Sequence, residues 1–232
     1  FTFGGCYSDL VYTKFSEGRT RQCRTMDLLG EGRGEIDVRY AMSLLRDHGP
    51  NAGEDWQPGK GLSGADVCMH ASFGPIRVSQ TTGSMISELS EHGDTHWVTG
   101  TSAPCTSIFK PVWFDSGLPD LGPQPNETYD EATLWWRHEN LHREILRDYA
   151  VRIKEIQVKR NGYENEILNR ISDLMNNSAS SREAFTKTCF DGANQREETW
   201  LKKIVDIPVK HRRPLLDKLA WQNFDRKARR AD

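Results

Sequence analysis

Polar and apolar residues alternate over short stretches in the first half of the chain, and this alternation predicts strands. Residues 1–15 alternate in this way, and Glu17-Gly18-Arg19 is expected to form a turn. Over residues 36–47 the apolar positions instead recur at helical spacing, which predicts a short helix. This helix is expected to end at His48-Gly49-Pro50, and the Gly-rich residues 49–64 predict a long loop.

An antiparallel meander is predicted over residues 76–114. Residues 76–89 are rich in β-branched side chains, and Glu91-His92-Gly93-Asp94 supplies turn residues where a hairpin needs them. Two further strands are expected over residues 95–101 and 107–114.

The rest of the chain has a helical pattern. Thr128-Tyr129-Asp130-Glu131 matches a capping box, in which a hydroxyl and a carboxylate satisfy free backbone amides at a helix start. Apolar residues at helical spacing then predict a long helix that ends at Asn161-Gly162. Further helices are expected over residues 163–175, 183–204 and 215–229.

Strands followed by helices are typical of the α+β class, with helices packed on an antiparallel sheet. The 232 residues suit one large domain. We expect residues 1–114 to form the sheet part with a short helix, residues 115–127 a Pro- and Gly-containing linker, and residues 128–232 the helical part of the same domain.

Charge and hydropathy narrow the choice of partners. The net charge is −2, the mean hydropathy is −0.69, and no apolar run approaches the roughly 20 residues that cross a bilayer. Basic residues form a run only in the tail over residues 226–230, which is typical of a solvated helix end. Neither a membrane nor nucleic acid is therefore an expected partner.

The chain contains five cysteines without a closely spaced pair: Cys6, Cys23, Cys68, Cys105 and Cys189. An odd, scattered set indicates free thiols in a reducing compartment, so a cytoplasmic location is expected. Cys6 is expected to be a small buried residue.

Four segments resemble the secernin and dipeptidase A family in sequence, order and spacing. They are residues 44–48 (LLRDH), 67–70 (VCMH), 80–89 (QTTGSMISEL) and 96–111 (HWVTGTSAPCTSIFKP). The third and fourth are specific, because such long irregular strings do not arise from strand propensity. The resemblance covers residues 1 to about 114.

The resemblance implies a four-layer αββα sandwich of the N-terminal-nucleophile type and a cysteine dipeptidase that hydrolyses amide bonds in small peptides or similar linear amides. In that class the first residue of the mature chain is the nucleophile, and its α-amino group is the general base. Phe1 has no nucleophilic side chain. We therefore expect an upstream segment or chain to supply an N-terminal cysteine, and residues 1–232 alone to be inactive.

The other implied partners are a peptide substrate and a second copy in a homo-oligomer. No cofactor and no metal are expected.

Five residues of these segments are candidates for substrate binding: His70, Thr82, Ser84, Thr99 and Thr101. Thr82 and Ser84 would share one face of a strand beside a glycine, where a substrate backbone can approach. Thr99 and Thr101 lie where one strand turns into the next. The alternative interpretation is structural, since threonine suits strands and His70 can fill a polar core position.

A competing motif lies at His138-Glu139-Asn140-Leu141-His142, which reads H-E-x-x-H. On a helix the two histidines can bind one zinc ion, with the glutamate as general base, so a zinc metalloprotease is the rival hypothesis. However, Ile145 and Asp148 occupy the positions where the extended motif has Gly and His. We expect His138 to pack against the sheet and His142 to lie at the exposed edge of the helix, without metal.

A third hypothesis is a non-catalytic structural or assembly subunit. The chain is rich in tryptophan, and five of these residues could supply an interface: Trp113, Trp135, Trp136, Trp200 and Trp221. Aromatic residues in a helical layer are more often part of the core.

Overall fold

The structure is a computed structural model, and it describes residues 2–7, 9, 17–60, 66–74, 77–91, 93–174 and 177–230. Its elements follow one another along the chain as α1 (Phe3–Tyr7), α3 (Gly18–Glu31), α4 (Val38–Leu45), β1 (Met85–Glu88), β2 (Thr95–Val98), β3 (Lys110–Val112), α5 (Leu134–Leu146), α6 (Tyr149–Leu174), α7 (Ala179–Val205) and α8 (Leu215–Lys227).

The sheet is an antiparallel meander in the order β1-β2-β3, as the sequence predicts. Trp97 of the central strand lies opposite Ile86 of β1 and Pro111 of β3, and its side chain is fully buried. The strands are shorter than expected. Beyond β1 and β2, the amide of Ser84 bonds to the side-chain oxygen of Thr99, and the chain then turns at Gly100, whose φ is 65°.

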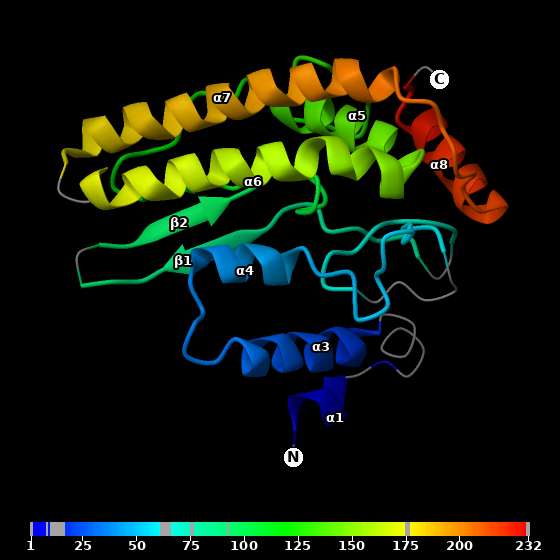
Figure 1. Cartoon of the computed structure of the whole chain (residues 1–232), viewed down its shortest axis with the longest axis horizontal. Coiled ribbons are helices and arrows are strands. Elements are labelled where there is room, and N and C mark those ends of the chain that lie inside the picture. Colours follow the sequence, from blue (N-terminus) through cyan, green and yellow to red (C-terminus); the bar gives the residue numbers. More distant parts are fainter. Residues whose placement is uncertain are drawn as a thin grey trace.

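Helices α5, α6 and α7 pack on one another and form a layer along one side of the sheet (Figure 1). Helix α7 lies against β3, where the Thr186 hydroxyl donates to the carbonyl of Pro111 at 3.1 Å. Helix α4 contacts β1. The core between helices and sheet includes the fully buried side chains of Phe109, Ile145 and Ile204. The α+β class is therefore confirmed.

The N-terminal predictions need correction. Residues 3–7 form helix α1 instead of a strand, while the expected strand positions 10–15 lie outside the described residues. Helix α3 replaces the expected turn, and it starts after Glu17 in a left-handed conformation (φ 49°). No residue of α3 is buried, so the sequence carries no apolar stripe that could have indicated it. Cys6 is exposed, not buried.

The break in the long helix also lies elsewhere than expected. Helix α5 ends at Leu146 and α6 begins at Tyr149, whereas Asn161-Gly162 lies inside α6. Between the helices, the Asp148 carboxylate accepts bonds from the amides of Lys210 (2.7 Å) and His211 (3.0 Å). These partners are distant in sequence, so local periodicity could not reveal the break.

Other helix starts shift by several residues. Thr133, not Thr128, caps α5 by accepting a bond from the amide of Trp136, and Ser178 caps α7. The expected helices over residues 36–47 and 215–229 are confirmed as α4 and α8. Four of the five candidate interface tryptophans are buried: Trp113, Trp136, Trp200 and Trp221.

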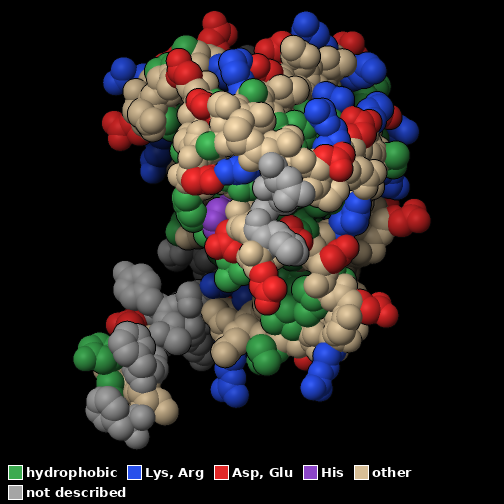
Figure 2. Space-filling model, turned by 90° about the vertical axis from the view of Figure 1, so that its left-hand side faces the viewer, with side chains coloured by type: hydrophobic (Ala, Val, Ile, Leu, Met, Phe, Trp, Pro, Cys, Tyr) green, Lys and Arg blue, Asp and Glu red, His purple; other side chains and the backbone are tan. Residues whose placement is uncertain are grey.

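Charge of both signs covers the face shown in Figure 2, where Lys and Arg side chains lie among Asp and Glu side chains over the upper part of the view. None of the helices in the described ranges is long and apolar enough to cross a membrane.

Candidate functional site

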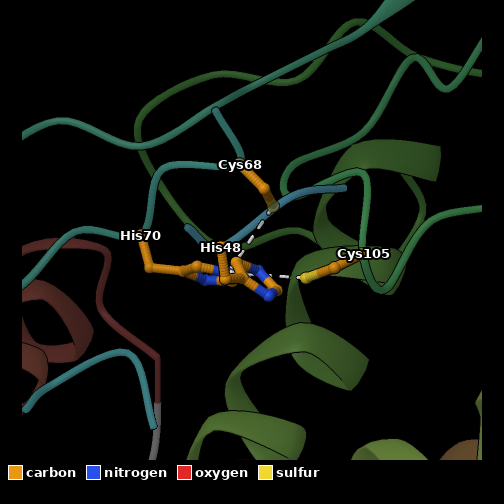
Figure 3. A group of neighbouring side chains, drawn as sticks. All are labelled: His48, Cys68, His70 and Cys105. Atoms are coloured by element: carbon orange, nitrogen blue, oxygen red, sulfur yellow. Dashed lines mark hydrogen bonds between the residues drawn. The ribbon is translucent and has the colours of Figure 1, made fainter. Parts of the chain in front are cut away.

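Four side chains from separate parts of the chain point toward one another in the interior (Figure 3): His48, Cys68, His70 and Cys105. Each offers one nitrogen or sulfur atom, and these four atoms all lie within 4.8 Å of one another. We call them the thiol–imidazole cluster. Its members come from three of the four segments that carry the family resemblance.

Asp47 holds the first two segments together. Its carbonyl accepts a bond from the amide of Cys68 (2.9 Å), which joins the end of α4 to the segment of residues 67–70. Its carboxylate accepts bonds from the amide of Gly49 (2.8 Å) and from the Arg24 guanidinium (2.7 Å and 3.0 Å). His48 is therefore fixed between two anchored neighbours.

Thr81 connects the third segment to the second and the fourth. It exchanges two bonds with Met69, since its amide donates to the Met69 carbonyl and its side-chain oxygen accepts from the Met69 amide, both at 3.0 Å. The Thr81 carbonyl also accepts a bond from Ala103 at 2.8 Å. All four segments thus form one hydrogen-bonded unit around the thiol–imidazole cluster.

The half-buried Arg46 and the buried Arg160 hold the loop that carries Cys105. Arg46 donates to the carbonyls of Pro104 (2.8 Å) and Ser107 (3.1 Å), and Arg160 donates to the carbonyl of Cys105 itself. Guanidinium groups carry several donors in a fixed plane, so each can bind more than one oxygen. The backbone on both sides of Cys105 is therefore fixed by charged donors.

The Nε2 atom of His70 is central to the cluster. It lies 3.1 Å from Nε2 of His48, 3.4 Å from Sγ of Cys105 and 3.6 Å from Sγ of Cys68. Cys68, His70 and Cys105 are each at most 3% exposed, while His48 is half-buried. The ring of His48 stacks on Trp56 with centroids 4.0 Å apart, and both side chains are half-buried.

A second row of polar groups orients His70 from behind. Nδ1 of His70 lies 3.4 Å from Nε2 of His142, and Nδ1 of His142 lies 3.2 Å from the carboxylate of Glu139. Because an ionised carboxylate only accepts, His142 carries its proton on Nδ1 and accepts one from Nδ1 of His70. This network assigns an unprotonated Nε2 to His70, with its lone pair toward the cluster.

The ionisation of these groups follows from burial and hydrogen bonding. Burial lowers the pKa of His70 to about 4, which leaves the ring neutral at pH 7. Burial raises the pKa of Cys68 well above its usual value. Burial also disfavours the Glu139 carboxylate, but His142, Arg143 and Ser102 outweigh it and hold its pKa at about 2.

Cys105 ionises more readily than Cys68. Burial opposes the thiolate, yet the hydrogen bond from the Cys68 thiol and the electrostatic influence of the adjacent His70 and His48 rings hold its pKa well below the usual range. The cluster therefore combines one readily ionised thiol with a neutral imidazole whose lone pair faces it.

The H-E-x-x-H motif lies on α5, and its three defining residues, His138, Glu139 and His142, are fully buried. The expected place of His142 at an exposed edge is wrong, because α5 is covered by α7 and α8 and His142 faces His70. His138 has different partners, since its Nδ1 lies 3.0 Å from Glu197 and its Nε2 lies 3.0 Å from the carbonyl of Ser102. The two imidazoles thus serve separate networks.

The candidate substrate-binding residues are divided between four environments. His70 lies in the thiol–imidazole cluster. Thr99 and Thr101 are buried, and their hydroxyls bond within their own turn, to the Thr101 carbonyl (3.2 Å) and the Thr99 carbonyl (3.3 Å). Ser84 is half-buried.

Thr82 is exposed, and it lines a surface hollow together with Glu139, Arg143 and Trp221. The other four candidates do not line this hollow. The structure therefore does not bring the five residues into one pocket.

His48, Cys68 and Cys105 are not among the functional residues predicted from the sequence. The separation of Cys68 and His70 by one residue is a recognisable ligand spacing, but two further donors had to be found at distant positions. Long-range contacts of Arg46, Asp47 and Thr81 bring these positions together.

Comparison with known proteins identifies no relative of this chain. Scans against models of protein families, curated proteins and solved structures give no match to this chain. The interpretation of the site therefore depends on its residues and contacts.

Proposed function

We propose that the chain is part of a cysteine amidohydrolase that cleaves amide bonds in small peptides or similar linear amides, with the nucleophile supplied by an upstream segment. One observation carries this proposal. The four segments that resemble the secernin and dipeptidase A family are separate in sequence, yet they meet around the thiol–imidazole cluster. Segments that served only separate strands and turns would not need to converge on one polar centre.

The pKa shifts and the burial of the interior cysteines support the proposal that the nucleophile comes from an upstream segment. A cysteine attacks as its thiolate and needs access to the substrate. Burial raises the pKa of Cys68 well above its usual value and that of Cys189 to about 12. Cys105 has a lowered pKa, but its side chain is only 3% exposed and is enclosed by the cluster. None of these three thiols combines reactivity with access.

The proposal also includes the αββα sandwich fold. In the αββα sandwich that the resemblance implies, the sheet β1-β2-β3 would be part of an inner layer, and α5, α6 and α7 an outer one. The packing of α7 on β3 suits this arrangement. The upstream segment would then add strands as well as the nucleophile.

The test compares residues 1–232 alone with a chain extended upstream to a mature N-terminal cysteine. We expect the extended chain to hydrolyse dipeptides and the short chain not to do so. The matched control is the extended chain with its N-terminal cysteine replaced by alanine, which should also be inactive. Full activity of residues 1–232 alone would contradict the proposal.

The same assay separates the two alternatives. Activity that is lost on chelation and in His142→Ala, but not in the N-terminal alanine variant, would favour the zinc metalloprotease. An inactive extended chain that still folds would favour a structural subunit.

A further inference from the structure

We propose that the thiol–imidazole cluster binds one Zn²⁺ ion through its two sulfur and two nitrogen atoms. This site goes beyond the proposed hydrolysis and is independent of the upstream nucleophile. It also differs from the sequence-based expectation, which includes no metal.

The spacing of the donor atoms fits a tetrahedral ion. With Zn–S distances of about 2.3 Å and Zn–N distances of about 2.0–2.1 Å, a tetrahedron places two nitrogens about 3.3 Å apart and a nitrogen and a sulfur about 3.6 Å apart. In the cluster, the two nitrogens are 3.1 Å apart, and the sulfurs of Cys105 and Cys68 are 3.4 Å and 3.6 Å from Nε2 of His70. These three distances are within about 0.2 Å of the ideal values, and all the other donor pairs lie within 4.8 Å.

The set of donors is the one that zinc prefers. Two thiolates with two imidazoles make a Cys₂His₂ site, and this combination is common in structural zinc sites. Cysteine binds metal as the thiolate and histidine as the neutral ring. The two thiolates would offset the charge of the ion in the interior.

Groups behind the ligands match the usual surroundings of a zinc site. A metal-bound histidine normally donates its second ring proton to a carboxylate, a carbonyl or a similar acceptor. Nδ1 of His70 faces His142, which is bonded to Glu139. The same contacts that fix the lone pair of His70 toward the cluster would therefore orient it on the ion.

The position of the site indicates a structural role. Four protein donors close a tetrahedral zinc site and leave no position for water or substrate. The ligands belong to the end of α4, the segment of residues 67–70 and the loop with Cys105, which are also joined by hydrogen bonds and by the ring contact of His48 with His70. A bound ion would fasten these three segments together.

The experiment measures metal directly. The protein is purified with a reductant and without chelators, loaded with zinc, desalted and analysed by mass spectrometry for metal content per chain. A second sample is loaded with cobalt, whose absorption spectrum reports tetrahedral thiolate ligands without any substitution. We expect one ion per chain and a spectrum with thiolate-to-cobalt bands.

Variants locate the ion. Cys105→Ser and Cys68→Ser should lose stoichiometric zinc or bind it at least tenfold more weakly in competition with a chelator. Cys189→Ser is the matched control, because Cys189 is a buried thiol on α7 outside the cluster. It should bind zinc like the unsubstituted protein.

Two results would overturn the proposal. One is an unsubstituted protein that, fully reduced, retains no zinc and gives no thiolate-to-cobalt bands. The other is zinc that persists in both cluster variants. Neither result bears on the proposed hydrolysis, which is measured by its dependence on the upstream cysteine.

Discussion

Arg46 and Glu164 form a bidentate ion pair, with 2.6 Å between Nη2 and Oε1 and 2.9 Å between Nη1 and Oε2. The pair joins the end of α4 to the middle of α6. Glu164 also accepts a bond from the amide of Phe109 at 2.8 Å, so it reaches the segment that leads into β3. The two side chains are only 11% and 4% exposed.

Removing one partner of this pair should be costly. In Glu164→Gln, the Arg46 charge stays buried without its counter-charge, so we expect the free energy of unfolding to fall by about 3–5 kcal/mol. Lys187→Met is the control, because its ion pair with Asp191 is exposed and should change stability by less than about 1 kcal/mol. Urea unfolding of both variants measures the difference, and equal losses would contradict the structural role of the pair.

Two helical glycines should respond to alanine in opposite directions. An added Cβ at Gly162 would meet no atom within 4 Å, so Gly162→Ala should stabilise α6 by about 0.5–1 kcal/mol. An added Cβ at Gly192 would collide with the hydroxyl of Tyr163, which bonds to the Cys189 carbonyl. Gly192→Ala should therefore destabilise by about 1–3 kcal/mol. Thermal or urea unfolding decides, and a destabilising Gly162→Ala would contradict a continuous α6.

Lys110 should make stability depend on alkaline pH. Its ammonium is buried and donates to the carbonyls of Thr99 and Ile108, both at 2.8 Å. Burial lowers its pKa from 10.5 to about 8, against the opposing charges of Glu197 and Glu164. The unfolded chain thus holds this proton more tightly than the folded one.

Folding therefore becomes more favourable as the pH rises from about 8 to about 10.5, where only the unfolded state still binds the proton. The gain attributable to Lys110 should approach about 3 kcal/mol. It is measured as the difference in unfolding free energy between the native protein and Lys110→Met over this range. A difference that does not change with pH would contradict the buried ammonium.

Substitution of two threonines in the segments that resemble the family should have different effects, one on stability and the other on substrate binding. Thr99→Val removes the acceptor for the amide of Ser84, so we expect a loss of about 1–3 kcal/mol in stability. Thr82→Val changes an exposed side chain beside the hollow near Glu139, and its effect on stability should be small. In the extended, active chain we expect Thr82→Val to raise KM. A stable Thr99→Val variant with an altered KM would reverse this assignment.

Patterns with local causes were predictable from the sequence. The meander of β1, β2 and β3 follows from β-branched residues and the turn before Thr95, and α4 and α8 follow from apolar spacing and helix-stopping residues. Helix α3 was missed because it buries none of its residues. The break near Asp148 was missed because the groups that bind the Asp148 carboxylate, the amides of Lys210 and His211, lie far along the chain.

The candidate site, too, could be predicted only as far as local sequence patterns reach. The resemblance selected the segments that converge, and His70 was identified among them. The partners of His70 could not be chosen, because the contacts that assemble the cluster are long-range backbone bonds such as that from Cys68 to Asp47. Thr99 and Thr101 looked like pocket residues, since the sequence does not show that their hydroxyls are satisfied within the turn.

The central claim is that these segments surround a site whose nucleophile comes from upstream, and covalent labelling tests it most directly. The extended chain is treated with a thiol-directed, peptide-like electrophile until activity is lost, and the modified residue is located by mass spectrometry. We predict one label per chain, on the N-terminal cysteine, with Cys68 and Cys105 unmodified. Loss of activity that follows labelling of Cys105 instead would contradict the account.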